Sequence, residues 1–163
     1  MVFHQMIRAM YVIPERFAFA VNVRGYELGV LVDSSIRIEA IANSHLQNYA
    51  TDIRRLGLSN RLQSFSLRVT AGGATLFYSG DVASFDEIRG HLDGCDILLL
   101  ETSHVDMAEV KEFVIVHPEM RIVLTHLSGE SAADLLRREF GVISNVQIAE
   151  EGMRVELVSS RLT

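Results

Sequence analysis

Acidic and histidine side chains follow three successive strand-like segments in the second half of the chain. Asp81 comes after the first segment, Glu101 and His104 come after the second, and His126 comes after the third. A fourth candidate position, His45, follows an alternating segment further upstream. In an open α/β sheet, ligands bind beside the carboxyl ends of the strands. We therefore expect these five side chains to lie together at one edge of a sheet.

Two imidazoles and a carboxylate suit a divalent metal such as zinc, because imidazole nitrogens and carboxylate oxygens both bind it. A carboxylate can serve two ions that lie about 3.5–4 Å apart. Asp81 is therefore predicted to be the bridge, with His45 on one ion and His126 on the other. A paired-metal site generates hydroxide near neutral pH and stabilises the attacking and leaving oxygens during hydrolysis.

Each of these residues also has a simpler interpretation. Asp81 fits the polar position of a Ser-Gly-Asp turn, and His126 fits a half-buried, hydrogen-bonded histidine. His45 lies in a polar stretch where a solvated side chain is the common outcome, and Glu101 fits a surface acid near a helix. The metal interpretation depends on the repetition of such residues at strand ends.

The elements that must position these side chains are predicted from hydrophobic periodicity. Alternation predicts strands within residues 17–42. Gly72 and Gly73 predict a hairpin, because they supply the positive φ that a tight turn needs. Downstream, apolar runs alternate with helix-like segments, which predicts strand–helix units. Beyond residue 42, the expected strands are Ser64–Val69, Ala74–Tyr78, Asp96–Leu100, Arg121–Thr125, Val146–Ala149 and Met153–Val158.

Helices are expected between and before these strands, and the predicted fold class is α/β (α+β), a mixed sheet with helices packed on it. The expected helices run from the start of the chain to about Val12, from Ser84 to about Leu92, from Asp106 to about His117 and over Glu130–Phe140, with a weaker one at Thr51–Leu56. Three polar pairs predict N-caps, namely Ser84 with Glu87, Asp106 with Glu109, and Ser128 with Ser131.

Composition limits the class of protein. The 163 residues correspond to about one domain, and we predict a single domain over residues 1–163. No apolar run approaches the ~20 residues of a membrane span, and the lone Cys95 fits a reducing compartment, so we expect a cytoplasmic protein with no membrane attachment. The formal net charge of −6 argues against a general nucleic-acid binder, although Arg54, Arg55 and Arg61 form a local basic cluster.

Four segments of the sequence resemble the metallo-β-lactamase-fold hydrolases, especially their ribonuclease Z-like and related phosphodiesterase branches. The segments are IEAIANSH (Ile38–His45), QSFSLRVTAGGATLFYSGD (Gln63–Asp81), DILLLETSH (Asp96–His104) and RIVLTHLSGE (Arg121–Glu130). The resemblance implies that His45, Asp81 and His126 are the metal ligands and that Asp81 bridges the ions. It also implies catalytic roles for Asp81, for Glu101 as a support of the ligands, and for His104 as a proton donor to a leaving alkoxide.

The His-x-His-x-Asp-His loop of this family is missing from the sequence. None of the six histidines lies two residues from another. Two protein ligands therefore remain for each ion, whereas zinc sites usually take at least three. The chain resembles the C-terminal half of the αββα sandwich. The expected cofactor is a divalent metal, zinc or else manganese or iron, and the incomplete ligand set allows that this chain alone holds none.

These features favour two functions of different classes. The first is a metal-dependent hydrolase that cleaves a small phosphodiester or an RNA with a metal-activated water, this chain supplying part of the site. The alternative is a metal-free interaction or assembly domain derived from the same fold. A nucleotide-binding domain has less support, because no Gly-rich turn joins a strand to a helix. Half of a two-layer fold leaves apolar surface uncovered, so we also expect a homo-oligomer or a partner chain.

Overall fold

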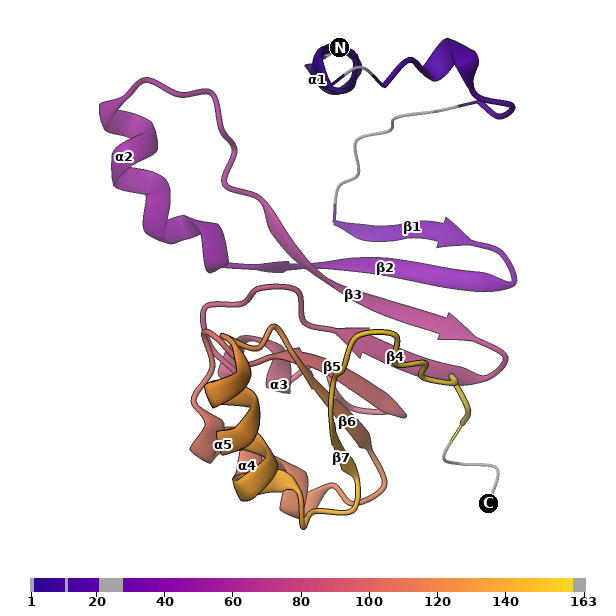
Figure 1. Cartoon of the computed structure of the whole chain (residues 1–163), viewed down its shortest axis with the longest axis vertical. Helices are drawn as coiled ribbons and strands as arrows, with labels where there is room; N and C mark the ends of the chain where they lie inside the picture. The colour runs from indigo at the N-terminus through magenta and orange to yellow at the C-terminus, as the bar shows by residue number, and fades with distance from the viewer. Residues whose placement is uncertain (1, 11, 21–27, 160–163) are drawn as a thin grey trace.

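A computed structural model describes residues 2–10, 12–20 and 28–159 and arranges the main part of them around one seven-stranded sheet (Figure 1). The strands lie side by side in the order of the sequence. Their bounds are β1 Gly29–Asp33, β2 Ile36–Asn43, β3 Ser64–Ala71, β4 Ala74–Tyr78, β5 Ile97–Glu101, β6 Arg121–Thr125 and β7 Val146–Ile148. Neighbours from β1 to β4 pair antiparallel, and those from β4 to β7 pair parallel. The predicted mixed sheet is confirmed.

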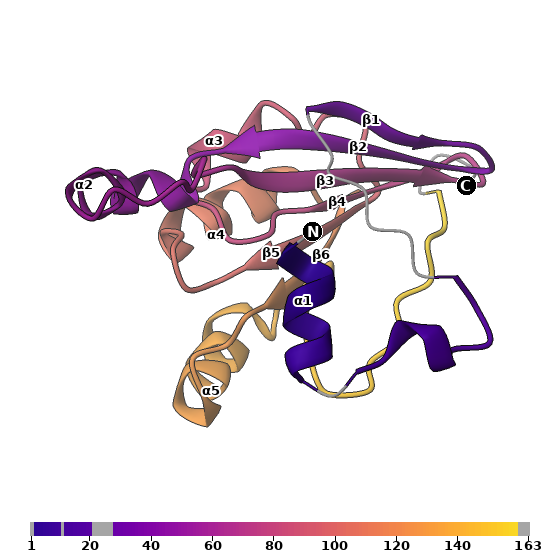
Figure 2. The same cartoon turned by 90° about the horizontal axis from the view of Figure 1, so that it is seen from above.

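Three helices connect the parallel strands, since such strands cannot be joined by a tight turn. All the α-helices in the described residues are α1 Val2–Ala9, α2 Ala50–Arg55, α3 Asp86–Arg89, α4 Met107–Val116 and α5 Glu130–Phe140, and short 3-10 helices lie at Pro14–Arg16 (η1) and His45–Tyr49 (η2). α3, α4 and α5 are the three crossovers. α2 projects beyond the end of the sheet (Figures 1 and 2).

The hydrophobic core lies between the parallel strands and their helices. Phe77 in β4, Leu98 in β5 and Leu124 in β6 are fully buried. They belong to one cluster with Val110 of α4 and Phe140 of α5. Close packing of this kind leaves the strands little freedom to shift. The core therefore fixes where each parallel strand ends, and with it the residues that follow.

The register of the sheet brings four carboxyl ends to one edge. β5 and β6 pair Glu101 with Thr125, and just beyond β4 the backbone N–H of Ser79 donates to the carbonyl of Leu99 at 2.9 Å. β2 runs in the same direction as β4, because both are antiparallel to β3 between them. The ends of β2, β4, β5 and β6 thus meet where the candidate residues were predicted to gather.

Two predicted strand segments are wrong. Residues 17–19 form bends, and the rings of Phe17 and Phe19 stack with their centroids 4.9 Å apart instead of alternating across a sheet. Residues 153–158 form no strand either. Alternating hydrophobicity makes a strand only where a neighbouring strand offers free N–H and C=O groups, and among the described residues neither segment is paired with a strand. Residues 21–27, which were also predicted to be strand-like, lie outside the described residues.

The helix boundaries are confirmed only in part. α1 ends at Ala9 and α3 at Arg89, each a few residues earlier than predicted. The weak helical segment predicted at Thr51–Leu56 corresponds to α2. No helix in the described parts of the chain is long and apolar enough to cross a bilayer.

Of the two N-caps predicted for α4 and α5, one is confirmed. Asp106 caps α4, since its carboxylate accepts the backbone N–H of Ala108 at 2.8 Å. Ser128 does not cap α5: Gly129 holds that position without a side-chain bond. The Ser128 hydroxyl lies instead 3.3 Å from the hydroxyl of Ser103. A contact between two loops has taken the place of the local cap.

Candidate metal centre

The five candidate residues lie at the edge where β2, β4, β5 and β6 end. His45 begins the 3-10 helix after β2, Asp81 follows β4, and Glu101 is the last residue of β5. His104 lies in the loop before α4, and His126 directly follows β6. The structure brings all five together, and we call them the acid–histidine cluster.

The carboxylate of Asp81 lies between two imidazoles. Its Oδ1 is 3.1 Å from Nδ1 of His126, and its Oδ2 is 3.9 Å from Nε2 of His45. The Asp81 side chain is 44% exposed. One oxygen faces each histidine, which is one of the arrangements in which a carboxylate can bridge two ions.

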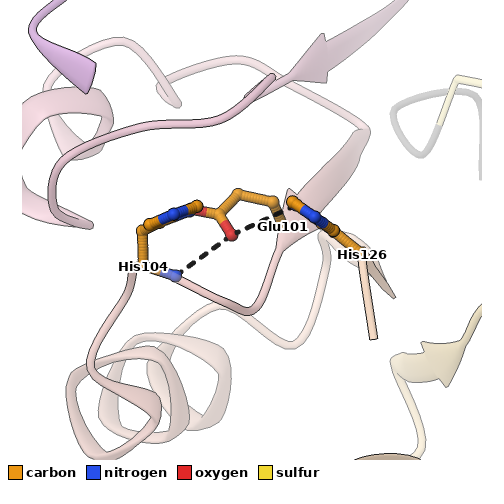
Figure 3. A group of neighbouring side chains, drawn as sticks. All are labelled: Glu101, His104 and His126. Atoms are coloured by element: carbon orange, nitrogen blue, oxygen red, sulfur yellow. Dashed lines mark hydrogen bonds and ion pairs between the residues drawn. The ribbon is translucent and has the colours of Figure 1, made fainter. Parts of the chain in front are cut away.

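Glu101 is buried, so its interpretation as a surface acid is wrong. Its side chain is 2% exposed, and Oε2 accepts the backbone N–H groups of Ser103 at 2.6 Å and His104 at 3.1 Å. Figure 3 shows Glu101 between two rings: Oε1 lies 3.1 Å from Nδ1 of His104, and Oε2 lies 3.9 Å from Nδ1 of His126. The carboxylate is therefore anchored by backbone donors while it orients His104.

His104 closes the cluster into a ring. Its imidazole meets that of His45 edge to face, with the ring centroids 4.7 Å apart, and the centroid of His126 is 6.0 Å away. Each member of the cluster thus contacts the next, from His45 through Asp81, His126, Glu101 and His104 back to His45. Five residues from four strand ends form one continuous site.

A line of buried hydrogen bonds beneath the cluster ties the strand ends together. Asn43 Nδ2 donates to Ser66 Oγ at 3.3 Å, and Ser66 Oγ donates to the carbonyl of Ser79 at 2.6 Å. The backbone N–H of Glu101 then donates to Ser79 Oγ at 3.0 Å. Both serines are fully buried. We did not predict these serines from the sequence, although the polar side chains interrupting apolar strands were a signal for such a network.

The backbone at His126 adopts a left-handed conformation, with φ at 56°. This conformation costs a residue other than glycine about 1–2 kcal/mol. The His126 carbonyl accepts the hydroxyl of Thr102 at 3.3 Å and that of Ser103 at 2.9 Å. Residues held in such conformations by their surroundings concentrate at functional sites, and here two hydroxyls hold the peptide whose side chain faces Asp81.

The donor types and the charge of the cluster fit a divalent metal. Imidazole nitrogens and carboxylate oxygens suit zinc, manganese and iron. Two carboxylates of charge −1 give the cluster −2 when its imidazoles are neutral. Among the described residues, one ligand atom from each of Glu101, His104 and His126 lies within 4.8 Å of the other two, which is close enough for one ion to be shared after small rotations.

Asp81 is better placed than Glu101 to bind an ion. Both oxygens of Glu101 already face N–H donors, whereas those of Asp81 face only the two imidazoles in the described part of the chain. His45, Asp81 and His126 therefore stay the predicted ligands, with Glu101 as their predicted support. That these residues bind metal stays a prediction, and the set gives each of two ions only two protein ligands.

Two arginines of the predicted basic cluster, and the histidine at the end of α4, lie apart from the acid–histidine cluster. Arg54 and Arg55 are exposed on the projecting α2, where Arg55 pairs with Asp52 at 2.9 Å. His117 follows α4 at the opposite edge, and its Nδ1 is 3.1 Å from Glu119. A backbone hydrogen bond at Glu119, together with this contact, holds the pKa of the Glu119 carboxyl below its ordinary value.

A family model described as the beta-lactamase superfamily domain matches residues 8–139. The chain belongs to the beta-lactamase superfamily. Its mixed seven-stranded sheet with helices is consistent with the fold of this superfamily. The predicted fold is thereby confirmed.

Solved structures share the fold of this superfamily member at low sequence identity. An isothiocyanate hydrolase from Delia radicum gut bacteria superposes with a TM-score of 0.64 at 15% identity over 94% of this chain. A possible metal-dependent hydrolase from Veillonella parvula DSM 2008 gives 0.62 at 14% over 94%. The metallo-beta-lactamase fold protein YhfI from Bacillus subtilis gives 0.56 at 22% over 78%. The chain spans 64%, 63% and 52% of these chains. No curated protein sequence matches it.

Proposed function

We propose that this chain supplies part of the active site of a metal-dependent phosphodiesterase of the ribonuclease Z-like branch. One observation carries the proposal: the carboxylate of Asp81 lies between the imidazoles of His45 and His126 at a sheet edge, with one oxygen toward each. The sequence resemblance to phosphodiesterases supports the substrate class, and the superfamily supports hydrolysis.

In this proposal, His45, Asp81 and His126 hold the metal, most readily zinc. When bound, the metal supplies a hydroxide near neutral pH and stabilises negative charge on the substrate. Glu101, fixed by backbone N–H groups, keeps the rings of His104 and His126 oriented toward the reacting phosphate. His104 donates a proton to the leaving alkoxide.

Because this chain offers only two protein ligands per ion, the proposed activity needs further ligands from elsewhere. Catalytic zinc sites have three protein ligands and one open position. We therefore propose that the remaining ligands reach the cluster from a second copy of this chain or from a partner chain. Without them, the cluster holds a divalent ion weakly.

The metal content of the protein, purified without chelator or affinity tag, tests this proposal. We expect one or two ions per chain by elemental analysis, together with hydrolysis of bis(4-nitrophenyl) phosphate. Asp81→Ala should lose nearly all of the metal, since the carboxylate faces both other ligands. Asp86→Ala is the matched control, because Asp86 is exposed on α3 and pairs with Arg89. An unchanged metal content in the Asp81 variant would exclude the bridging role.

The alternative function is a metal-free interaction domain, favoured by the small number of ligands per ion. It predicts no metal in the purified protein and none taken up when zinc or manganese is added. A metal-free result for this chain alone would then be followed by a search for a partner that carries the missing histidines. Metal uptake once such a partner is added would support the hydrolase, and no uptake with the partner present would support the interaction domain.

A further inference from the structure

His45 and Asp81 are carried by loops that the sheet does not connect directly. They follow β2 and β4, and β3 lies between these strands. The ladders from β2 to β3 and from β3 to β4 place the two strand ends, but the ladders end before His45 and Asp81. A bond between the two loops themselves would hold the imidazole and the carboxylate opposite each other.

Glu87 in α3 bonds to both loops. Its Oε1 accepts the backbone N–H of Ser44 at 3.0 Å and also the Ser44 hydroxyl. Its Oε2 accepts the backbone N–H of Ala83 at 3.0 Å. Ser44 directly precedes His45, and Ala83 lies two residues after Asp81. A single half-buried carboxylate thus spans the two loops.

The sequence predicted a local role for this residue, as the partner of Ser84 in a capping box. That prediction is wrong, since α3 begins at Asp86 and its N-cap position is Phe85, without a side-chain bond. The bond from Glu87 to Ser44 joins residues 43 positions apart and contributes nothing to a helix cap. Its effect is on the loop that carries the histidine.

We propose that Glu87 is a positioning residue that fixes His45 against Asp81. The inference rests on the proposed function in taking these two side chains as metal ligands. Hydrogen bonds to an ionised carboxylate are among the stronger ones in proteins, and one oxygen serves each loop. Loss of either bond lets the loops separate and moves the His45 ring away from that of His104, 4.7 Å from it.

Glu87→Gln and Asp86→Asn form a matched pair for the test. Both substitutions remove one negative charge from the first turn of α3. The glutamine amide keeps one acceptor oxygen and turns an NH₂ group toward the other loop, so the backbone N–H of either Ser44 or Ala83 loses its acceptor. Asp86 contacts Arg89 on its own helix, and its loss leaves both loops bonded.

Amide hydrogen exchange and ring contacts, measured by NMR on the metal-free protein, give the decisive result. In Glu87→Gln we expect the Ser44 or Ala83 amide to exchange about 10-fold faster or more, and the contact between the His45 and His104 rings to weaken. Asp86→Asn should change neither. A purely helix-capping role would speed exchange within α3 and leave the ring contact intact, which would overturn the proposal.

The proposal can also be tested on the wild-type protein alone, so it remains testable if the Glu87→Gln variant does not fold. If the Ser44 and Ala83 amides exchange as fast as exposed, unbonded amides, the proposal is wrong. Calorimetric titration with Zn²⁺ separates it from the proposed function. We expect Glu87→Gln to bind Zn²⁺ 10–100-fold more weakly than Asp86→Asn, in the usual range for partners that orient ligands. Absence of Zn²⁺ binding by the wild type contradicts the proposed function, while the exchange data still decide on Glu87.

Discussion

The imidazole of His104 lies against the carboxylate of Glu101, with Nδ1 3.1 Å from Oε1. When that carboxylate is ionised it only accepts hydrogen bonds, so Nδ1 is then the donor and Nε2 is the nitrogen left to face a bound molecule. The side chain of His104 is 39% exposed. The proposed proton transfer to a leaving alkoxide requires the form of His104 in which Nε2 also carries a hydrogen.

His104→Ala should lower turnover while the metal content stays the same. General acid catalysis contributes about 10²–10⁴-fold, and the loss should be large for a phosphodiester with an alkoxide leaving group. It should be small for a 4-nitrophenolate leaving group, which departs without a proton. His117→Ala is the control, since His117 lies at the opposite edge of the sheet. Equal losses for both leaving groups would contradict the proton-donor role.

At the scale of single residues, the sequence predicts the cluster but not its support. Asp81, Glu101 and His126 could be found because each lies at the end of a recognisable strand or within three residues after it. For the buried pair Ser66 and Ser79, the polar interruption of an apolar strand was a signal of a buried hydrogen bond, but the sequence did not give their partners, which lie on other strands. The burial of Glu101 was missed for the same reason: its oxygens bond to the backbone of the loop that folds back over it.

At the scale of elements, the end of α5 depends on a glycine for space. Gly141 has φ −62° and ψ −14°, a helical conformation that any residue adopts, but an added Cβ would overlap the carbonyl oxygen of Arg137. Gly90, at the end of α3, has φ −68° and ψ −8° and open space around the same position. The two glycines therefore form a matched pair that isolates the steric effect.

Gly141→Ala should destabilise the fold by about 1–3 kcal/mol, the usual cost of overpacking. Gly90→Ala should be neutral or stabilise it by up to about 1 kcal/mol, because alanine restricts the unfolded chain. Urea unfolding followed by circular dichroism measures both. Equal effects at the two positions would show that the backbone at Gly141 shifts to accept the methyl group.

Hydrophobic periodicity predicted the described strands of the sheet well and the chain segments beside it poorly. The apolar runs at β5 and β6 are stable in one arrangement, which is burial between other strands and helices. The alternating segments at residues 17–19 and 153–158 are compatible with several arrangements, including ring stacking and packing without strand pairing. Which one forms depends on whether a neighbouring strand is available, and that is a property of the whole fold.

At the scale of the molecule, apolar side chains are exposed on several described segments. They include Met6, Met10, Phe17 and Phe19 near the start of the chain, and Val30 and Val32 on the edge strand β1. Exposed apolar surface of this kind marks interaction sites, and an unpaired edge strand offers backbone groups to another chain. Association with a second copy or a partner therefore remains our prediction.

Light scattering coupled to size-exclusion chromatography tests this association. We expect a mass above that of one chain at micromolar concentration, or a partner that co-purifies with the chain. Val32→Lys should weaken self-association, because it places a charge on β1, the edge strand of the sheet. A monodisperse monomer that captures no partner contradicts the prediction.

The order of the strands also bears on how the protein forms during synthesis. Because strand order in the sheet equals strand order in the sequence, each strand that leaves the ribosome pairs with one that is already in place. No strand has to be inserted between two earlier ones, and contacts between neighbours in sequence favour fast folding. The residues of the acid–histidine cluster emerge in the same order, from His45 through Asp81 and Glu101 to His126, so the ring of contacts can close only after β6 has emerged.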